Sequence, residues 1–183
     1  MNGQGRLFYV MGPSGAGKDT LLSFARERLR GSRVLFAHRY ITRHAAAGGE
    51  NHVHLTPEEF DARARLDLFA LHWSSHGLRY GIGIEIEAWM ARGFTVVVNG
   101  SREYLPQAIE RFPALGAIHI DAQAEILAAR LAARGRETID EVRARLARRV
   151  PLVVPPRVAL TTIDNSGALE TAGEALVEAL RTA

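Results

Sequence analysis

A glycine-rich segment near the start of the chain has the clearest chemical signature in the sequence. It consists of Gly12, Pro13, Ser14, Gly15, Ala16, Gly17 and Lys18, and it lies between a short apolar run and a run with helical spacing. Glycines let the backbone curl into a nest of inward-pointing N–H groups, and the N-terminus of a helix favours anions. A lysine at the end of such a loop reaches the β- and γ-phosphates of a nucleotide. We therefore predict that this segment binds nucleotide phosphates.

The residue after Lys18 departs from the usual form of this loop. A strict phosphate-binding loop has serine or threonine there to help hold Mg²⁺, whereas this chain has Asp19 followed by Thr20. Asp19 is a candidate Mg²⁺ ligand, directly or through water. It is equally able to cap the helix, which would leave Thr20 to contact a phosphate, and the sequence does not decide between these roles. We place both residues in the nucleotide site and assign Asp19 to the metal.

The composition supports a special role for Lys18. The 183 residues include 23 basic and 20 acidic ones, which gives a formal net charge of +3, and Lys18 is the only lysine. The other basic residues are arginines, whose planar guanidinium group differs from the compact and flexible ammonium of lysine. A net charge this small gives only weak support for a nucleic-acid partner.

The absence of cysteine excludes a disulfide scaffold, a thiolate metal site and a cysteine nucleophile. The apolar run near the N-terminus, residues 7–11, is too short for the apolar region of a signal peptide or for a membrane span. We therefore expect a soluble, cytoplasmic protein without a membrane partner.

Short apolar runs alternate with amphipathic segments along the chain, and this alternation indicates how the chemical residues are positioned. Five runs have the pattern of buried strands, at 7–11, 34–37, 94–98, 115–120 and 158–163. Helices are expected at 19–30, 84–91, 122–133 and 168–181, and one more begins at Thr56, where Glu59 completes a capping box. Residues 68–75 form a further strand candidate, and 38–55 are expected to be loop or hairpin. The pattern predicts an α/β fold, with a five-stranded parallel sheet between two helical layers in a three-layer αβα arrangement.

Several segments resemble the acceptor-binding region and the lid of guanylate kinases. The matching stretches are Tyr40-Ile41-Thr42-Arg43, Glu50-Asn51-His52 and the turn at 76–81, followed by Arg130-Leu131, Arg134-Gly135-Arg136-Glu137 and Arg145-Leu146. The resemblance covers nearly the whole chain. It implies one P-loop kinase domain over residues 1–183, with an acceptor-binding insertion at about 38–92 and an Arg-rich lid at about 134–149.

The departures from guanylate kinases concern the groups that read the base. By the resemblance, the glutamate that recognises guanine falls on Leu71, and the hairpin aspartate and tyrosine become Asn51 and His52. Arg39 is an additional arginine, four residues before Arg43. A site without these carboxylates should not select guanine, because polar edges of the base would be left unpaired. The acceptor is therefore expected to present a phosphate but no guanine.

The shared motifs and the departures together resemble ribose 1,5-bisphosphate phosphokinases, the guanylate-kinase relatives of bacterial phosphonate utilisation. This resemblance rests on residues 12–20 and 37–43, on Glu50-Asn51-His52 and on Val98-Asn99-Gly100-Ser101-Arg102. It implies that ATP, with Mg²⁺, phosphorylates the 1-phosphate of ribose 1,5-bisphosphate to give 5-phosphoribosyl diphosphate (PRPP) and ADP. The expected partner is this small phosphorylated sugar. The oligomeric state is left open, with a homodimer as one alternative.

The resemblance also assigns roles to individual residues. The residues expected to stabilise the transferring phosphoryl group are Lys18 and the lid arginines Arg130, Arg134 and Arg136. The acceptor is expected to contact Arg39, Arg43, His52, Tyr80, Asn99, Ser101 and Arg102. Asn99 stands where guanylate kinases usually have an aspartate that supports Mg²⁺, and Asp19 is a candidate replacement for that charge. Asn165 is assigned to the nucleotide site beside the adenine of ATP, and Trp73 and Trp89 are expected to be core residues.

Three other functions are compatible with parts of the sequence. A nucleoside monophosphate kinase with altered base specificity would use the same loop and lid. A non-catalytic guanylate-kinase-like binding module would share the fold but typically lacks an intact phosphate loop, so Lys18 argues against it. An Arg-rich nucleic-acid binder would show steep salt dependence, but acidic residues dilute the basic stretch at 130–149. We therefore expect no nucleic-acid partner.

Overall fold

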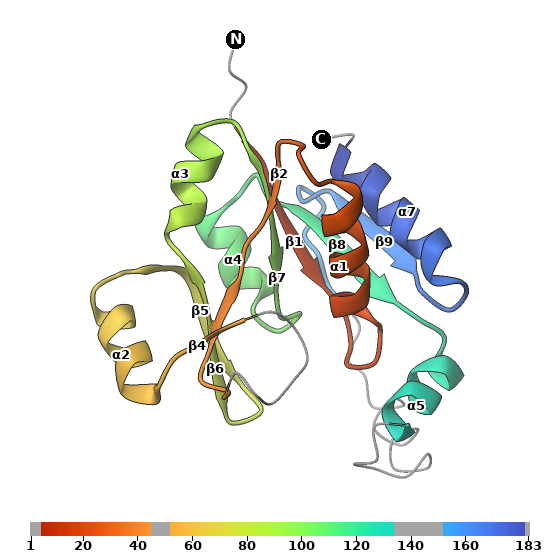
Figure 1. Cartoon of the computed structure of the whole chain (residues 1–183), viewed down its shortest axis with the longest axis horizontal. Coiled ribbons are helices and arrows are strands. Elements are labelled where there is room, and N and C mark those ends of the chain that lie inside the picture. Colours follow the sequence, from red (N-terminus) through yellow and green to blue (C-terminus); the bar gives the residue numbers. More distant parts are fainter. Residues whose placement is uncertain (1–4, 45–51, 134–151, 182–183) are drawn as a thin grey trace.

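The computed structural model describes residues 5–44, 52–133 and 152–181, and a parallel β-sheet forms its centre (Figure 1). Five strands are hydrogen-bonded in the order β2-β7-β1-β8-β9. Their bounds, in that order, are Val34–Phe36, Thr95–Asn99, Leu7–Met11, Gly116–Asp121 and Leu160–Asp164. Every neighbouring pair is parallel. The five-stranded parallel sheet predicted from the sequence is thereby confirmed.

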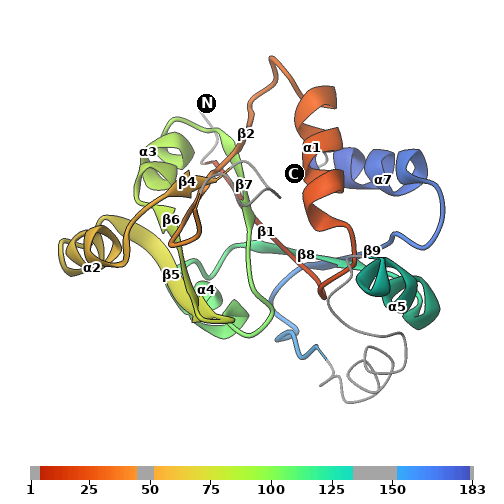
Figure 2. The same ribbon diagram turned by 60° about the horizontal axis from the view of Figure 1, so that its bottom comes forward.

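The central strand β1 is buried on both faces, because helices cover the sheet from two sides. Side chains alternate along a strand, so Phe8 and Val10 face one layer while Leu7, Tyr9 and Met11 face the other. The first layer contains α1 (Lys18–Arg28), α5 (Ala124–Ala132) and α7 (Leu169–Arg181), and the second contains α3 (Glu85–Ala91) and α4 (Leu105–Arg111). Figure 1 and Figure 2 both show α1 and α7 side by side. None of the helices in the described ranges is long and apolar enough to cross a membrane.

A second, four-stranded sheet packs against the first and was not predicted. Its order is β4-β3-β6-β5, with bounds Val53–His54, Arg39–Ile41, Leu78–Gly83 and Phe69–Ser75. The strands β3 and β4 pair in parallel, so the expectation of a hairpin over 38–55 is wrong, and residues 45–51 lie outside the described residues. A hairpin requires antiparallel neighbours, whereas the antiparallel partner of β3 is β6, which comes much later in the chain. Leu71, Trp73 and Ile82 of this sheet share a hydrophobic core with β1 and β7.

Helix α2 (Pro57–Arg65) lies on the outer side of the second sheet (Figure 2) and begins where the sequence predicts. Thr56 Oγ1 accepts a hydrogen bond of 3.2 Å from the Glu59 amide. The carboxylate of Glu59 bonds Arg63 Nη2 at 2.7 Å, one turn further along. Only the Thr56 half of the predicted capping box is therefore present among the described residues. Arg79 of β6 forms an ion pair with Asp61 of α2, which connects the helix to the sheet. The hydrogen bond from Arg79 and its positive charge lower the pKa of Asp61.

Parallel strands bring their carboxyl ends to the same edge of the five-stranded sheet. Val10 is the partner of Asn99 across β1 and β7. The glycine-rich segment leaves β1 at this edge and enters α1, whose first residue is Lys18. Ligands of open parallel sheets bind outside the carboxyl ends of the strands. The topology therefore places the glycine-rich segment beside Asn99, at the edge where a ligand site is expected.

Candidate active site

The loop between β1 and α1 curls around the ammonium group of Lys18. Lys18 Nζ donates hydrogen bonds to the carbonyl oxygens of Gly12 at 3.0 Å and of Pro13 at 3.5 Å. Gly17, the residue before the helix, has a φ of 83°, in the left-handed region that favours glycine. A Cβ atom at this position would also lie 2.5 Å from Asn165 Nδ2. Both the backbone conformation and the close approach therefore require glycine at position 17.

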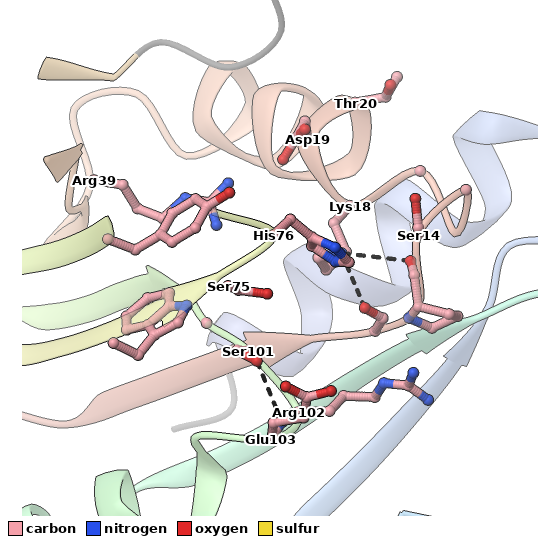
Figure 3. A pocket seen from close by; sticks show the side chains of 17 residues that line it. Ser14, Lys18, Asp19, Thr20, Arg39, Ser75, His76, Ser101, Arg102 and Glu103 are labelled. Carbon is pink, nitrogen blue, oxygen red and sulfur yellow. Dashed lines mark hydrogen bonds between the residues drawn. The ribbon is translucent and has the colours of Figure 1, made fainter. Parts of the chain in front are cut away.

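A cleft of about 320 Å³ opens in front of this loop (Figure 3). Its lining comes from the loop and the start of α1, from β3, from the β5–β6 hairpin and from the segment after β7. The predicted nucleotide residues from Gly12 to Thr20 all line it except Ala16, which is buried. The predicted acceptor residues that line it are Arg39, Tyr80, Ser101 and Arg102. One cleft thus joins the glycine-rich loop to four residues that were assigned to the acceptor.

Asp19 lines this cleft, and a hydrogen bond from Asn99 orients its carboxylate. The Nδ2 atom of Asn99 donates a hydrogen bond of 2.9 Å to Asp19 Oδ1. Asn99 is 6% exposed and is not among the residues that line the cleft, whereas Asp19 is exposed and lines it together with Thr20. The side chain of Asn99 therefore acts on the carboxylate of Asp19, and its predicted contact with the acceptor stays a prediction.

An aromatic stack supports Arg39, which lies across the cleft from the loop (Figure 3). Arg39 Cζ lies 5.1 Å from the ring centroid of Tyr80, a cation–π contact. The Tyr80 ring stacks on Trp73 with 5.5 Å between centroids and 8° between planes, and Trp73 stacks on Tyr104 at 5.4 Å. Trp73 is 8% exposed, as expected for a core residue, yet it also lines the cleft. The stack holds the guanidinium group of Arg39 at the cleft.

Tyr9 anchors the segment that follows β7. Its hydroxyl donates a hydrogen bond of 2.8 Å to the Ser101 carbonyl oxygen and accepts one of 2.9 Å from the Ser101 amide. The side chain of Tyr9 is fully buried, and burial raises the pKa of the phenol. Ser101 Oγ in turn accepts a hydrogen bond of 3.2 Å from the Glu103 amide. Ser101, Arg102 and Glu103 are thereby fixed at the edge of the cleft.

Asn165 and Arg130 support the glycine-rich loop from behind. Asn165 Nδ2 donates a hydrogen bond of 2.7 Å to the Ala16 carbonyl oxygen, and the residue is 4% exposed. Arg130 Nη2 donates one of 2.9 Å to the Asn165 carbonyl oxygen. These contacts link α5 and the turn after β9 to the loop. The predicted roles of Asn165 at the adenine and of Arg130 at the transferring group stay predictions, because both side chains bond the protein itself in this structure.

Two predicted acceptor residues, Arg43 and His52, contact each other and are not among the residues that line the cleft. His52 Nε2 lies 3.0 Å from the Arg43 carbonyl oxygen, and His52 Nδ1 lies 3.5 Å from Arg43 Nη2. Their assignment to the acceptor stays a prediction. The lid arginines Arg134 and Arg136, like the whole segment at about 134–149, lie outside the described residues.

Three side chains that line the cleft were not assigned a role from the sequence, namely Ser75, His76 and Glu103. Ser75 and His76 lie at the tip of the β5–β6 hairpin, and Glu103 directly follows the predicted residue Arg102. His76 is the first residue of the turn at 76–81, while Ser75 and Glu103 directly adjoin that turn and Arg102. The resemblance of the turn at 76–81 to the acceptor-binding region of guanylate kinases pointed to this part of the chain. Nothing in the sequence shows which of its side chains face the cleft.

Comparisons with known proteins cover nearly the whole chain, although no protein-family model matches it. A protein named "Ribose 1,5-bisphosphate phosphokinase PhnN" from Burkholderia pseudomallei (strain K96243) is 63% identical over 175 residues, which cover 96% of this chain and 95% of the relative. A protein of the same name from Thiobacillus denitrificans (strain ATCC 25259 / T1) is 56% identical over 181 residues, which cover 98% of this chain and 95% of the relative. Among solved structures, guanylate kinase from Anaplasma phagocytophilum has a TM-score of 0.69 at 17% identity, covering 97% of this chain and 85% of that one.

The parallel sheet, the glycine-rich loop that ends in Lys18 and the likeness to guanylate kinase define an α/β P-loop kinase. The high identity to the curated relatives over nearly their full length is more specific than the fold. The chain belongs to the ribose 1,5-bisphosphate phosphokinase PhnN family. The resemblance that was drawn from the motifs, and from the departures from guanylate kinases, is thereby confirmed.

Proposed function

We propose that this chain is a ribose 1,5-bisphosphate phosphokinase, which transfers the γ-phosphoryl group of ATP to the 1-phosphate of the sugar and releases PRPP and ADP. The observation that carries the proposal is the cleft, in which Lys18 and its loop lie across from Arg39, and which Tyr80 also lines. Such a cleft suits two phosphorylated molecules, one on each wall. Membership of the family supports the identity of the sugar.

The proposed reaction requires no general base. A phosphate dianion is already a nucleophile at neutral pH, so an oxygen of the 1-phosphate attacks the γ-phosphorus of ATP. The bond between this phosphorus and the β,γ-bridging oxygen breaks, and its electron pair leaves with ADP. The principal obstacle is repulsion between two anions, so catalysis consists of positioning and of charge stabilisation.

In this proposal, the two walls of the cleft bind different substrates. Lys18 and the loop amides bind the β- and γ-phosphates of ATP, as the helix start and the ammonium group favour. Arg39, held against the Tyr80 ring, binds a phosphate of the acceptor, and Arg102 lines the same cleft from the segment after β7. The lid arginines, Arg130, Arg134 and Arg136, would close over the transferring group and exclude water.

The residues at the start of α1 fit a Mg²⁺ ion. Asp19 presents a carboxylate at the cleft, and the Asn99 amide orients it. Mg²⁺ prefers oxygen ligands and is usually bound through one or two carboxylates together with substrate phosphates. Asp19 would hold the ion, which would neutralise charge on the phosphates.

A coupled assay of ADP release tests the proposed function. Ribose 1,5-bisphosphate is compared with GMP and with other nucleoside monophosphates at the same ATP and Mg²⁺ concentrations, and the product is identified by phosphorus NMR. We expect the highest kcat/KM with ribose 1,5-bisphosphate and a diphosphate signal from PRPP. The variant Lys18→Ala controls for contaminating kinases. A preference for GMP would assign the chain instead to the nucleoside monophosphate kinases.

A further inference from the structure

His76 lies at the tip of the β5–β6 hairpin and directs its imidazole toward the cleft, on the side where Lys18 projects (Figure 3). The strands β5 and β6 pair as far as Ser75 and Leu78, so His76 and Gly77 are the two residues of the turn. The residue is exposed, and its imidazole makes no hydrogen bond within the part of the chain that the structure describes. This ring is therefore available to a ligand in the cleft.

The backbone of this turn suits other residues better than histidine. The φ angle is 51° at His76 and 72° at Gly77, so both residues are left-handed, as in the type I′ turns of tight hairpins. Asn-Gly and Gly-Gly are the preferred pairs in such turns, because asparagine and glycine adopt this conformation most readily. Residues in sparsely populated conformations concentrate at functional sites. The presence of histidine here points to a function of its side chain.

The charge of the cleft indicates that a further donor for phosphate is needed there. The lining contains three cationic side chains, Lys18, Arg39 and Arg102, and two carboxylates, Asp19 and Glu103. The proposed acceptor carries two phosphates, each with a charge of about −1.5 to −2 at neutral pH, in addition to those of ATP. The carboxylates offset much of the positive charge, so a further N–H donor on the acceptor wall stabilises the bound sugar. His76 supplies such a donor from the same hairpin as Tyr80.

We propose that His76 is an acceptor-binding residue, whose imidazole donates a hydrogen bond to a phosphate of the sugar. This rests on the proposed function, since it takes the acceptor to be a phosphorylated sugar. Lys18 and the loop account for the phosphates of ATP, whereas His76 comes from the β5–β6 hairpin, which also supplies Tyr80 to the cleft. His76 therefore contributes to the affinity for the acceptor and leaves the affinity for ATP unchanged.

Two substitutions remove the imidazole and keep the turn. His76→Gly gives a Gly-Gly turn without a side chain, and His76→Asn gives the Asn-Gly pair that type I′ turns prefer, so neither should lower Tm. His76→Gly should reduce kcat/KM for ribose 1,5-bisphosphate by roughly 10- to 100-fold, as the loss of a hydrogen bond to a charged group predicts, with KM for ATP unchanged. His76→Asn should lose less, because its short amide still carries N–H donors.

His72 provides a matched control, since it is an exposed histidine of the same hairpin and is not among the residues that line the cleft. His72→Asn should leave the kinetic constants of both substrates unchanged. Native kcat/KM for the acceptor in His76→Gly would overturn the proposal, and so would a change confined to KM for ATP.

Calorimetry with ribose 1,5-bisphosphate, without ATP, separates this result from a failure of the proposed function. If the native chain does not turn over ribose 1,5-bisphosphate, the proposed function fails. Weaker binding of ribose 1,5-bisphosphate by His76→Gly would then still support the role of His76. Equal binding by the native chain and the variant, or no binding by the native chain, would overturn it.

Discussion

Asn99 Nδ2 donates a hydrogen bond of 2.9 Å to Asp19 Oδ1, so the end of strand β7 orients the acidic residue that follows the loop lysine. Asn99 is buried and Asp19 is exposed at the cleft. A buried amide orients the carboxylate without adding a second negative charge beside the phosphates of ATP, whereas an aspartate at position 99 would repel Asp19. The contact accounts for two departures together, namely the acid after Lys18, where a strict phosphate-binding loop has serine or threonine, and the amide at the strand end, where guanylate kinases usually have an aspartate.

The Mg²⁺ dependence of activity tests the role of this pair. We expect Asp19→Ala to raise steeply the Mg²⁺ concentration that gives half-maximal activity, because the ion loses a carboxylate ligand. Asn99→Ala should raise it by about 10-fold, the usual effect of removing a residue that orients a ligand. The measurement is a Mg²⁺ titration of ADP release at fixed ATP. Glu103→Gln removes the other carboxylate of the cleft and serves as the control. An unchanged Mg²⁺ requirement in Asp19→Ala would refute the assignment.

Loss of the ammonium group of Lys18 should reduce catalysis strongly. Lys18→Ala is expected to lower kcat by about 100- to 1000-fold, because charge on the transferring phosphoryl group loses a preorganised partner. Steady-state kinetics at saturating ATP and acceptor measure this effect, and thermal unfolding checks that the chain folds. Arg30→Ala, which removes an exposed guanidinium group that pairs with Glu27, should leave kcat unchanged. Near-native kcat in Lys18→Ala would contradict the proposed role of the loop.

The cation–π contact between Arg39 and Tyr80 should matter for the acceptor and not for ATP. Arg39→Ala is expected to raise KM for ribose 1,5-bisphosphate, because it removes a guanidinium group that binds phosphate. Tyr80→Leu should raise this KM by about 2- to 30-fold, the range expected when a guanidinium group loses its aromatic support. Arg63 lies 5.3 Å from the ring centroid of Tyr40 but is not among the residues that line the cleft, so Arg63→Ala is the matched control. A rise in KM for ATP, with KM for ribose 1,5-bisphosphate unchanged, would contradict the assignment of Arg39 to the acceptor.

The features that the sequence predicted are those with a continuous local signal. Residues 94–98 are apolar apart from Thr95, and a run of this kind indicates a central strand without further information, as the burial of Val96, Val97 and Val98 in β7 confirms. The glycine-rich loop could also be predicted, because its glycine spacing and its final lysine are recognisable and it lies between a strand and a helix. The start of α2 at Thr56 followed from its capping residue.

The features that were missed depend on partners distant in the sequence. The strands β3 and β4 have three and two residues, too few for an alternating pattern, and they exist because β3 pairs with β6. Helix α4 follows Tyr104, which makes no capping hydrogen bond with its side chain, so only Pro106 in its first turn marks its start. The bonds between Tyr9 and Ser101 join residues 92 positions apart, and only the assembled sheet brings them together.

The hydroxyl of Tyr9 should stabilise the fold in a manner that depends on pH. Tyr9→Phe leaves the Ser101 amide and carbonyl without their partner, which should cost about 1–3 kcal/mol of unfolding free energy. Burial raises the pKa of Tyr9 in the folded chain, whereas an unfolded tyrosine ionises near pH 10. The stabilisation is therefore complete below that pH and declines as the pH rises above it, because the unfolded state then gains the ionised phenolate. Urea unfolding of the native chain and of Tyr9→Phe at about pH 8 and about pH 10.5 measures this, and the difference between the two proteins should narrow at the higher pH. Other titrating groups cancel in the comparison, so a difference that stays constant or widens would contradict the role of the buried phenol.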